Sequence, residues 1–87
     1  MNTWAYVFIY SRQPKKVVNR VRKISGVVHA DALFGSPDAI AIVEGKDIKS
    51  MDAVIDKIAE IPQIVNTDTK VARWINDVSL PFIEMKK

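Results

Sequence analysis

The feature that most constrains this chain is the stretch Gly26–Gly45, whose two strand-like segments are largely apolar on both faces. Residues 27–34 and 39–43 are rich in β-branched and apolar side chains, and turn-forming residues at 35–38 separate them. A hairpin on the surface of a monomer usually has one polar face. We therefore expect a covering layer on each side of this hairpin, and an 87-residue chain has few segments left to supply both layers.

The size and composition describe one small globular domain. A chain of this length buries roughly 60–65% of its unfolded surface, and domains near this size are often stabilised further by a disulfide, a metal or oligomerisation. The sequence has no cysteine and a single histidine. No disulfide can form, and we expect no metal site and no cofactor. Oligomerisation is the remaining route to added stability.

The charge and hydropathy indicate no special environment. The net charge of +3 is mild and does not by itself indicate a nucleic-acid partner. No run of eighteen apolar residues is present, and the N-terminus lacks the pattern of a signal peptide. We expect a soluble, cytoplasmic protein that has no membrane partner.

Four segments have the composition of strands. They cover residues 3–10, 27–34, 39–44 and 64–74. The last is the most polar of the four, which is typical of a strand at the edge of a sheet.

Two segments show helical spacing of apolar residues. The first begins at Pro14, and we expect Gly26 to end it as a left-handed cap. The second follows Asp47 or Ser50 as N-cap and stops at Pro62; its apolar stripe is Ile48, Met51, Val54, Ile55 and Ile58. The order of strands and helices is βαββαβ, which predicts a ferredoxin-like α+β fold: a four-stranded antiparallel sheet with both helices on one face.

The face of the sheet away from the helices is predicted to be apolar. Alternation along the first strand places large aromatic residues on one side: Trp4, Tyr6, Phe8 and Tyr10. Exposed apolar patches of this size usually mark an interface. We expect a homo-oligomer that forms by packing of sheet on sheet.

His29 and Asp31 are the one pair that resembles catalytic machinery. They lie two residues apart on one strand, so they share a face and could interact. A general base with an orienting carboxylate has this form, but no nucleophile is specified nearby. A polar pair at an exposed or interfacial position is the commoner explanation, and we assign no catalytic residue.

The first predicted helix is rich in Lys and Arg. These side chains could contact phosphates, but they also surround an apolar stripe as any solvated helix face does. We expect the solvated face, and no direct binding to DNA.

Two further positions could serve a small polar ligand. Gly35 would permit close approach of the backbone, and the carboxylate of Asp38 could hold an ammonium group. An ordinary hairpin turn is the commoner explanation of both residues. Thr67 and Thr69 share a face of the last strand, where their hydroxyls could bind a ligand or could simply suit a strand.

An ordered set of residues resembles the effector-binding domain of the Lrp/AsnC (feast/famine) transcription regulators. It comprises Ile24–Ser25–Gly26–Val27–Val28, Ala30, Gly35–x–x–Asp38, Ile61–Pro62, Val65 and Thr67–x–Thr69, within residues 3–75. Two positions depart from the family pattern. Gln63 stands where Gly usually follows Ile–Pro, and Ser36–Pro37 stand where an aromatic residue often precedes the Asp.

This resemblance implies a fold, an assembly and a function. It implies a ligand-binding domain over residues 1–75 and a tail over 76–87, without the helix-turn-helix domain of full-length regulators. It implies a dimeric α/β barrel, often assembled further into octamers, with amino-acid effectors bound between dimers. Carried over by position, the pocket residues are Gly35, Ser36, Pro37, Asp38, Thr67 and Thr69. The chain would then be a non-enzymatic effector-binding and oligomerisation module that modulates transcription regulation, with full-length Lrp/AsnC regulators as possible partners.

Besides nucleic-acid binding through the first predicted helix, two alternatives stay open at this stage. The first is a small dimeric α/β-barrel enzyme, such as a cofactor-free monooxygenase or isomerase, because fold alone does not specify function. That enzyme would need a pocket between the sheet and the helices, with His29 or a tyrosine inside it. The second concerns the tail, which could fold on its own domain or dock on a neighbouring subunit.

Overall fold

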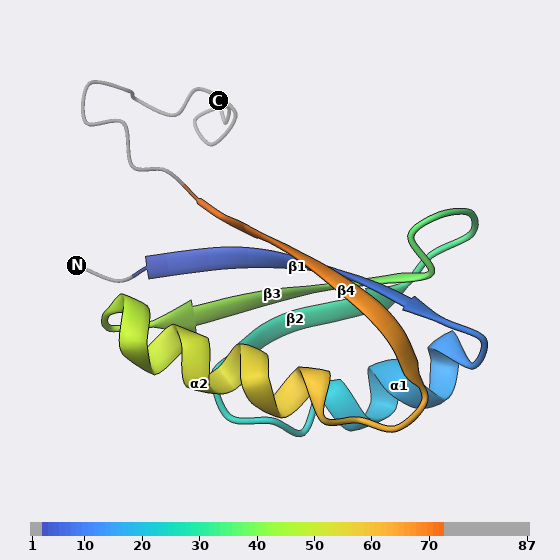
Figure 1. The fold of residues 1–87 in the computed structure, drawn as a ribbon, viewed down its shortest axis with the longest axis horizontal. Helices are drawn as coiled ribbons and strands as arrows, with labels where there is room; N and C mark the ends of the chain where they lie inside the picture. The colour runs from blue at the N-terminus through green and yellow to red at the C-terminus, as the bar shows by residue number, and fades with distance from the viewer. Residues whose placement is uncertain (1–2, 73–87) are drawn as a thin grey trace.

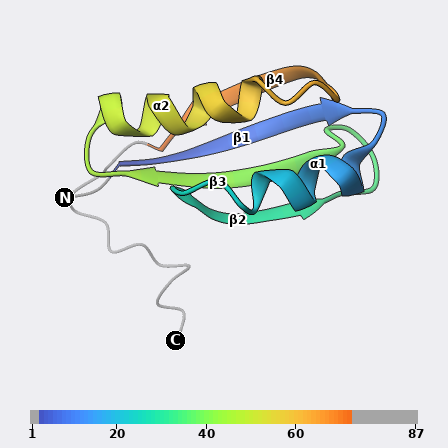
Figure 2. The same ribbon diagram turned by 90° about the horizontal axis from the view of Figure 1, so that it is seen from below.

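The computed structural model describes residues 3–72, which form a single sheet with two helices. The elements in chain order are β1 (Thr3–Ser11), α1 (Pro14–Val21), β2 (Val27–Ala32), β3 (Ala39–Gly45), α2 (Ile48–Ala59) and β4 (Ile64–Val71). The strands pair antiparallel in the order β2-β3-β1-β4, and both helices cover the same face of the sheet (Figures 1 and 2). The predicted ferredoxin-like α+β fold is confirmed.

The core lies between the sheet and the helices. The two central strands contribute mainly small residues to it, and α1 and α2 contribute larger ones. All of the following are at most 3% exposed: Ala5, Val7, Ile9, Ala39, Ala41, Val43, Val17, Val18, Val21, Met51 and Ile58. Small side chains on the sheet let the helices approach closely.

The opposite face of the sheet is apolar at its centre and polar at its edges. Trp4 and Tyr6 are each 40% exposed, and Phe8, Tyr10, Ile40 and Ile42 are partly exposed. We call these six residues the open face. The register places His29 and Asp31 beside it on β2, and Asn66, Asp68 and Lys70 beside it on β4. Among residues 3–72 no element covers this face (Figure 1).

The first helix is shorter than predicted. It ends at Val21, and a tight turn follows in which Lys23 and Ile24 donate backbone hydrogen bonds to the carbonyls three residues earlier. Gly26 has the positive φ expected of it, at 101°, but it lies immediately before β2 and is not the helix cap. The cap position at Gly26 is therefore wrong, because the chain leaves helical geometry earlier to let Ile24 pack against the core.

Three further details differ from the sequence expectation. The connection between β2 and β3 covers residues 33–38, so it is longer than the predicted four-residue turn. Ile48 is 58% exposed and does not belong to the core stripe, because it occupies the first position of α2. The last strand ends at Val71, and β4 lies at the sheet edge as predicted. The predicted tail, residues 76–87, lies outside the described residues.

Candidate functional site

The loop between β2 and β3 carries four of the six predicted site residues. It rises from the end of the sheet on the side opposite the helices (Figure 1). Its base is anchored: Leu33 N–H donates to the Asp38 carbonyl at 2.8 Å, and Asp38 N–H donates to the Ile9 carbonyl at 2.9 Å. Its tip is exposed, with Phe34 fully accessible and no atom within 4 Å of a Cβ placed on Gly35. The loop is thus a projection with a fixed base.

Asp38 is held in place by the end of β1. Its Oδ2 accepts a hydrogen bond from the backbone N–H of Ser11 at 2.9 Å. The Ser11 hydroxyl donates to the Gln63 carbonyl at 2.8 Å and accepts from the Gln13 N–H at 2.9 Å. Ser11 is buried, at 5% exposed. One carboxylate oxygen of Asp38 therefore has a structural partner, and the carboxylate keeps further acceptor capacity for a ligand.

Ser11 is the residue of this network that the sequence did not single out. In the sequence it is an unremarkable polar residue at the end of an apolar strand. Its three hydrogen bonds join it to residues 2, 27 and 52 positions away in the sequence. The one sequence signal that could have indicated its role is its position between the end of an apolar strand and Pro14.

Thr67 and Thr69 lie on the helix side of the sheet. In the register they pair with Ile9 and Val7, whose side chains face the core, and both threonines are partly exposed on the edge strand. Ala39, which follows Asp38, pairs with Ile9 from the other side. By this register the threonines are two strands away from the base of the loop, on the helix side of the sheet. The loop rises on the other side (Figure 1).

Within one chain, therefore, the predicted residues do not line one cavity. Three surface cavities of about 370, 270 and 270 Å³ are lined by other described residues. The assignment of these six residues stays a prediction.

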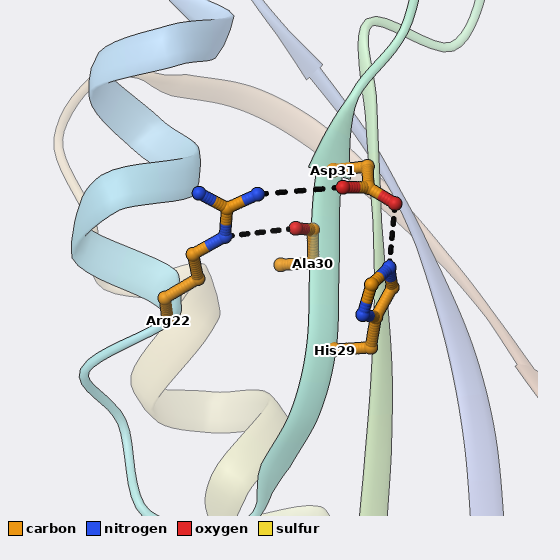
Figure 3. Close-up of polar contacts among 4 residues, drawn as sticks. All are labelled: Arg22, His29, Ala30 and Asp31. Carbon is orange, nitrogen blue, oxygen red and sulfur yellow. Dashed lines mark hydrogen bonds and ion pairs between the residues drawn. The ribbon is translucent and has the colours of Figure 1, made fainter.

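His29 and Asp31 do interact, and a third residue joins them. His29 Nε2 lies 2.6 Å from Asp31 Oδ2, and Arg22 Nη2 lies 3.3 Å from Asp31 Oδ1 (Figure 3). Arg22 Nε also donates to the Ala30 carbonyl at 2.9 Å. The side chains of all three ionisable residues are about half exposed. The cluster ties the end of α1 to β2, which is a structural role for the pair.

The enzyme alternative needed a pocket between the sheet and the helices. In the described residues, that space holds the buried apolar core. His29 and the tyrosines at 6 and 10 project from the other side of the sheet. The structure thus places each of the side chains proposed for catalysis outside the space where such a pocket would form.

Metal ligands and membrane spans give no further site in this part of the chain. Among residues 3–72, no group of three or more His, Asp or Glu side chains is placed to hold a metal ion. No helix in the same range is long and apolar enough to cross a membrane.

Comparison with known proteins gives one family and a set of similar structures. Residues 5–73 match the family model described as the Lrp/AsnC ligand binding domain. Among curated proteins, no sequence matches this chain significantly.

Two of the similar structures have nearly the same length as this domain. The hypothetical protein PHS023 from Pyrococcus horikoshii has 25% sequence identity and a TM-score of 0.74, over 87% of this chain and 94% of that one. The protein FFRP-DM1 has 26% identity and a TM-score of 0.73, over 84% of this chain and 100% of that one.

A longer protein shares the fold. The transcriptional regulator NMB0573 from Neisseria meningitidis, solved as a complex with L-Met, has 19% identity and a TM-score of 0.68. The match covers 95% of this chain and 58% of that regulator.

Proposed function

The chain belongs to the Lrp/AsnC ligand-binding domain family, and from this premise we propose that it is a non-enzymatic module whose effector is an amino acid. Domains of this family bind effectors and serve regulation. The amino-acid class, the residues that bind it and the assembly are our proposal.

The observation that carries the proposal is the fixed carboxylate at the base of an exposed loop. Ser11 holds Asp38 in one orientation, so an effector ammonium group would meet a preorganised acceptor. Gly35, with open space around it, lets the loop backbone approach a ligand closely. The backbone N–H groups of Gly35 and Ser36 would then donate hydrogen bonds to the effector carboxylate.

The second half of the pocket would come from assembly. Family domains typically dimerise, and the open face supplies an apolar surface for a face-to-face dimer, the dimeric α/β barrel. We propose that dimers associate further, into an octamer or a similar ring, and that a loop from one dimer then meets Thr67 and Thr69 of the next. Effector binding between dimers would bias the equilibrium among assemblies.

The partners follow from the same interfaces. A full-length Lrp/AsnC regulator carries a domain of the same fold, so mixed assemblies would let this chain change the regulator's assembly state. We propose that it acts in this way in the cytoplasm, where such regulators meet their promoters.

Calorimetric titration against the twenty amino acids tests the proposal, with methionine first because the Neisseria regulator was solved with L-Met. We expect one or a few amino acids to bind. The Asp38→Asn variant removes the charge but keeps an oxygen acceptor for Ser11, and we expect it to weaken binding at least tenfold. Asp52→Asn, at an exposed position of α2, is the matched control and should bind as the wild type does.

Two outcomes would contradict the proposal. One is the absence of heat for every amino acid at millimolar concentration. The other is an Asp38→Asn variant that binds as tightly as Asp52→Asn, which would move the site away from the loop.

A further inference from the structure

Positive charge in this domain is concentrated on one segment. Residues 12–23 contain six Lys or Arg and no Asp or Glu. The rest of the described chain contains four Lys or Arg and eight Asp or Glu. The mild net charge of the whole chain therefore conceals a basic segment on an otherwise acidic domain.

Half of these basic side chains lie on α1, namely Lys15, Lys16 and Arg20, and the other half flank it directly. The inward side of the helix is Val17, Val18 and Val21, all buried. At about 100° per residue, the three basic residues of α1 and Asn19 lie on the arc opposite these valines. All six basic residues are exposed: Arg12, Lys15, Lys16, Arg20, Arg22 and Lys23. We call this set the basic face.

The second helix shows what an ordinary solvated face looks like in the same domain. Its exposed residues mix both signs: Lys49, Asp52, Asp56, Lys57 and Glu60. Mixed signs are the usual state of a protein surface, because neighbouring like charges repel. The basic face departs from that pattern although both helices lie on the same side of the sheet (Figure 2).

Little of the charge on the basic face is neutralised within the domain. Arg22 pairs with Asp31 at 3.3 Å, and Arg20 donates to the uncharged amide oxygen of Gln63 at 3.4 Å. Within residues 3–72, Arg20 therefore forms no ion pair. The remaining four cations of the basic face have no side-chain partner in that range: Arg12, Lys15, Lys16 and Lys23. They can neutralise the charges of a polyanion, which then releases the counterions condensed on it.

Residues 12–23 expose no large apolar side chain, and this favours a nucleic acid over an acidic protein as the partner of the basic face. The large apolar side chains exposed in the described chain lie on other segments, and residues 12–23 contribute none of them. Protein interfaces have an apolar core and are depleted in Lys, so an acidic protein is a poor match for this face. A phosphate backbone needs only positioned cations.

We propose that the basic face of α1 binds the phosphate backbone of double-stranded nucleic acid without reading its sequence. The expectation of no direct DNA binding rested on the lack of a helix-turn-helix pattern and on an ordinary solvated face, and the segregation of charge in the structure argues against the second ground. A dimer formed through the open face would leave α1 on its outer side. Binding through α1 is therefore compatible with dimerisation.

Fluorescence anisotropy with a labelled DNA duplex of mixed sequence tests this proposal. If the four cations without a side-chain partner each contact one phosphate, the affinity should fall about 150-fold between about 50 and about 200 mM salt. The triple variant Lys15→Gln, Lys16→Gln, Lys23→Gln should bind at least tenfold more weakly at the lower salt. Its affinity should change only about 3- to 4-fold over the same range, since one contact remains.

The chain offers a control with the same change in net charge. The triple variant Lys46→Gln, Lys49→Gln, Lys57→Gln removes three lysines from α2 and the residues before it, and it should bind DNA within twofold of the wild type. Gln and Lys have similar helix propensities, so circular dichroism should show that both triple variants fold.

Three results would overturn the proposal. The first is no binding by the wild type at the lower salt. The second is equal weakening by both triple variants, which would show a response to net charge alone. The third is displacement of the DNA by polyglutamate at equal charge concentration, which would assign the face to acidic protein partners.

Discussion

Asp38 has two roles that one substitution pair can separate. Its carboxylate supports the loop through Ser11 N–H, across 27 residues of sequence, and it faces the proposed effector. A hydrogen bond to a charged group contributes about 1.5–3 kcal/mol. We expect Asp38→Ala to lower the free energy of unfolding by that amount, and Asp38→Asn to lower it by about half as much, as measured by urea denaturation.

The two variants together test whether the hydrogen bond between Ser11 and Asp38 stabilises the loop and whether an amide oxygen can replace the carboxylate in it. If Asn and Ala destabilise equally, the amide oxygen does not replace the carboxylate at Ser11. If neither variant destabilises the protein, the hydrogen bond from Ser11 does not stabilise the loop. Asp38 would then not be a preorganised acceptor for the effector.

Asp47 gives a prediction that depends on pH. Its Oδ1 accepts the backbone N–H of Ser50 at 2.8 Å at the start of α2. This backbone hydrogen bond, followed by the side-chain hydrogen bond from Ser50, lowers the pKa of Asp47. Because the folded pKa lies below the unfolded one, the charged cap stabilises the fold above the unfolded pKa, near 4, and its contribution is lost as pH falls through the folded value.

Thermal unfolding of the wild type and of Asp47→Ser checks this. Serine is an uncharged N-cap of similar quality, so the variant lacks the titration but keeps the cap. Between about pH 5 and about pH 3, the melting temperature of the wild type should fall further than that of the variant. Parallel curves would show that ionisation of Asp47 does not stabilise α2.

At the scale of elements, the contact between the end of β3 and α2 depends on Gly45. A Cβ at this position would lie 2.6 Å from the backbone nitrogen of Met51, and that nitrogen is held by its bond to the Asp47 carbonyl. Backbone cannot move aside as a flexible side chain can, so Gly45→Ala should push α2 off the sheet. We expect a loss of about 2–3 kcal/mol in unfolding free energy.

Gly35→Ala is the matched control for that substitution. Gly35 has a φ of 106° and open space around it. An added methyl group would therefore contact no other atom, and the substitution would cost only the backbone strain of a non-glycine residue at this φ. The expected loss is about 1–2 kcal/mol. Equal losses at the two positions would mean that the approach of β3 to α2 tolerates a methyl group.

At the scale of the whole molecule, the open face predicts a dimer. Tyr6 and Trp4 are 40% exposed at its centre, and burying such aromatic residues typically dominates the stability of an interface. Tyr6→Glu would bury a charge there, and we expect it to weaken the dimer at least 100-fold by sedimentation. Ile48→Glu, at an exposed apolar position on α2, should leave the dimer unchanged.

A wild-type protein that sediments as a monomer at micromolar concentration would contradict this prediction. So would equal weakening by the two variants, because Ile48 lies on the helix side of the sheet and far from the open face in the fold.

Three surfaces of the domain are separate in space, so their roles can be tested one at a time. The open face lies on one side of the sheet, the basic face of α1 on the other, and the 33–38 loop at the end of the hairpin (Figures 1 and 2). A variant in one surface should leave the other two functions intact. Effector binding is the exception, because the proposed pocket needs a neighbouring dimer.

The sequence by itself determined the kind and order of the elements. Periodicity, Pro14 at the start of α1 and Asp47 at the cap of α2 are local signals, and together with the right-handed crossover rule they lead to the observed βαββαβ sheet. The largely apolar faces of the central hairpin likewise predicted the helix layer and the apolar centre of the open face, although β2 places the polar His29 and Asp31 beside that centre.

The tertiary structure decided what depends on partners distant in sequence. Helix α1 ends at Val21 because Ile24 turns to the core, and Asp38 is fixed by a residue 27 positions away. The register places Thr67 on the helix side of the sheet, away from the loop. Local propensity carries no information on such contacts, because their energy comes from residues that only the fold brings together. For the same reason, the central hairpin could be recognised from the sequence, but not the way its loop is held.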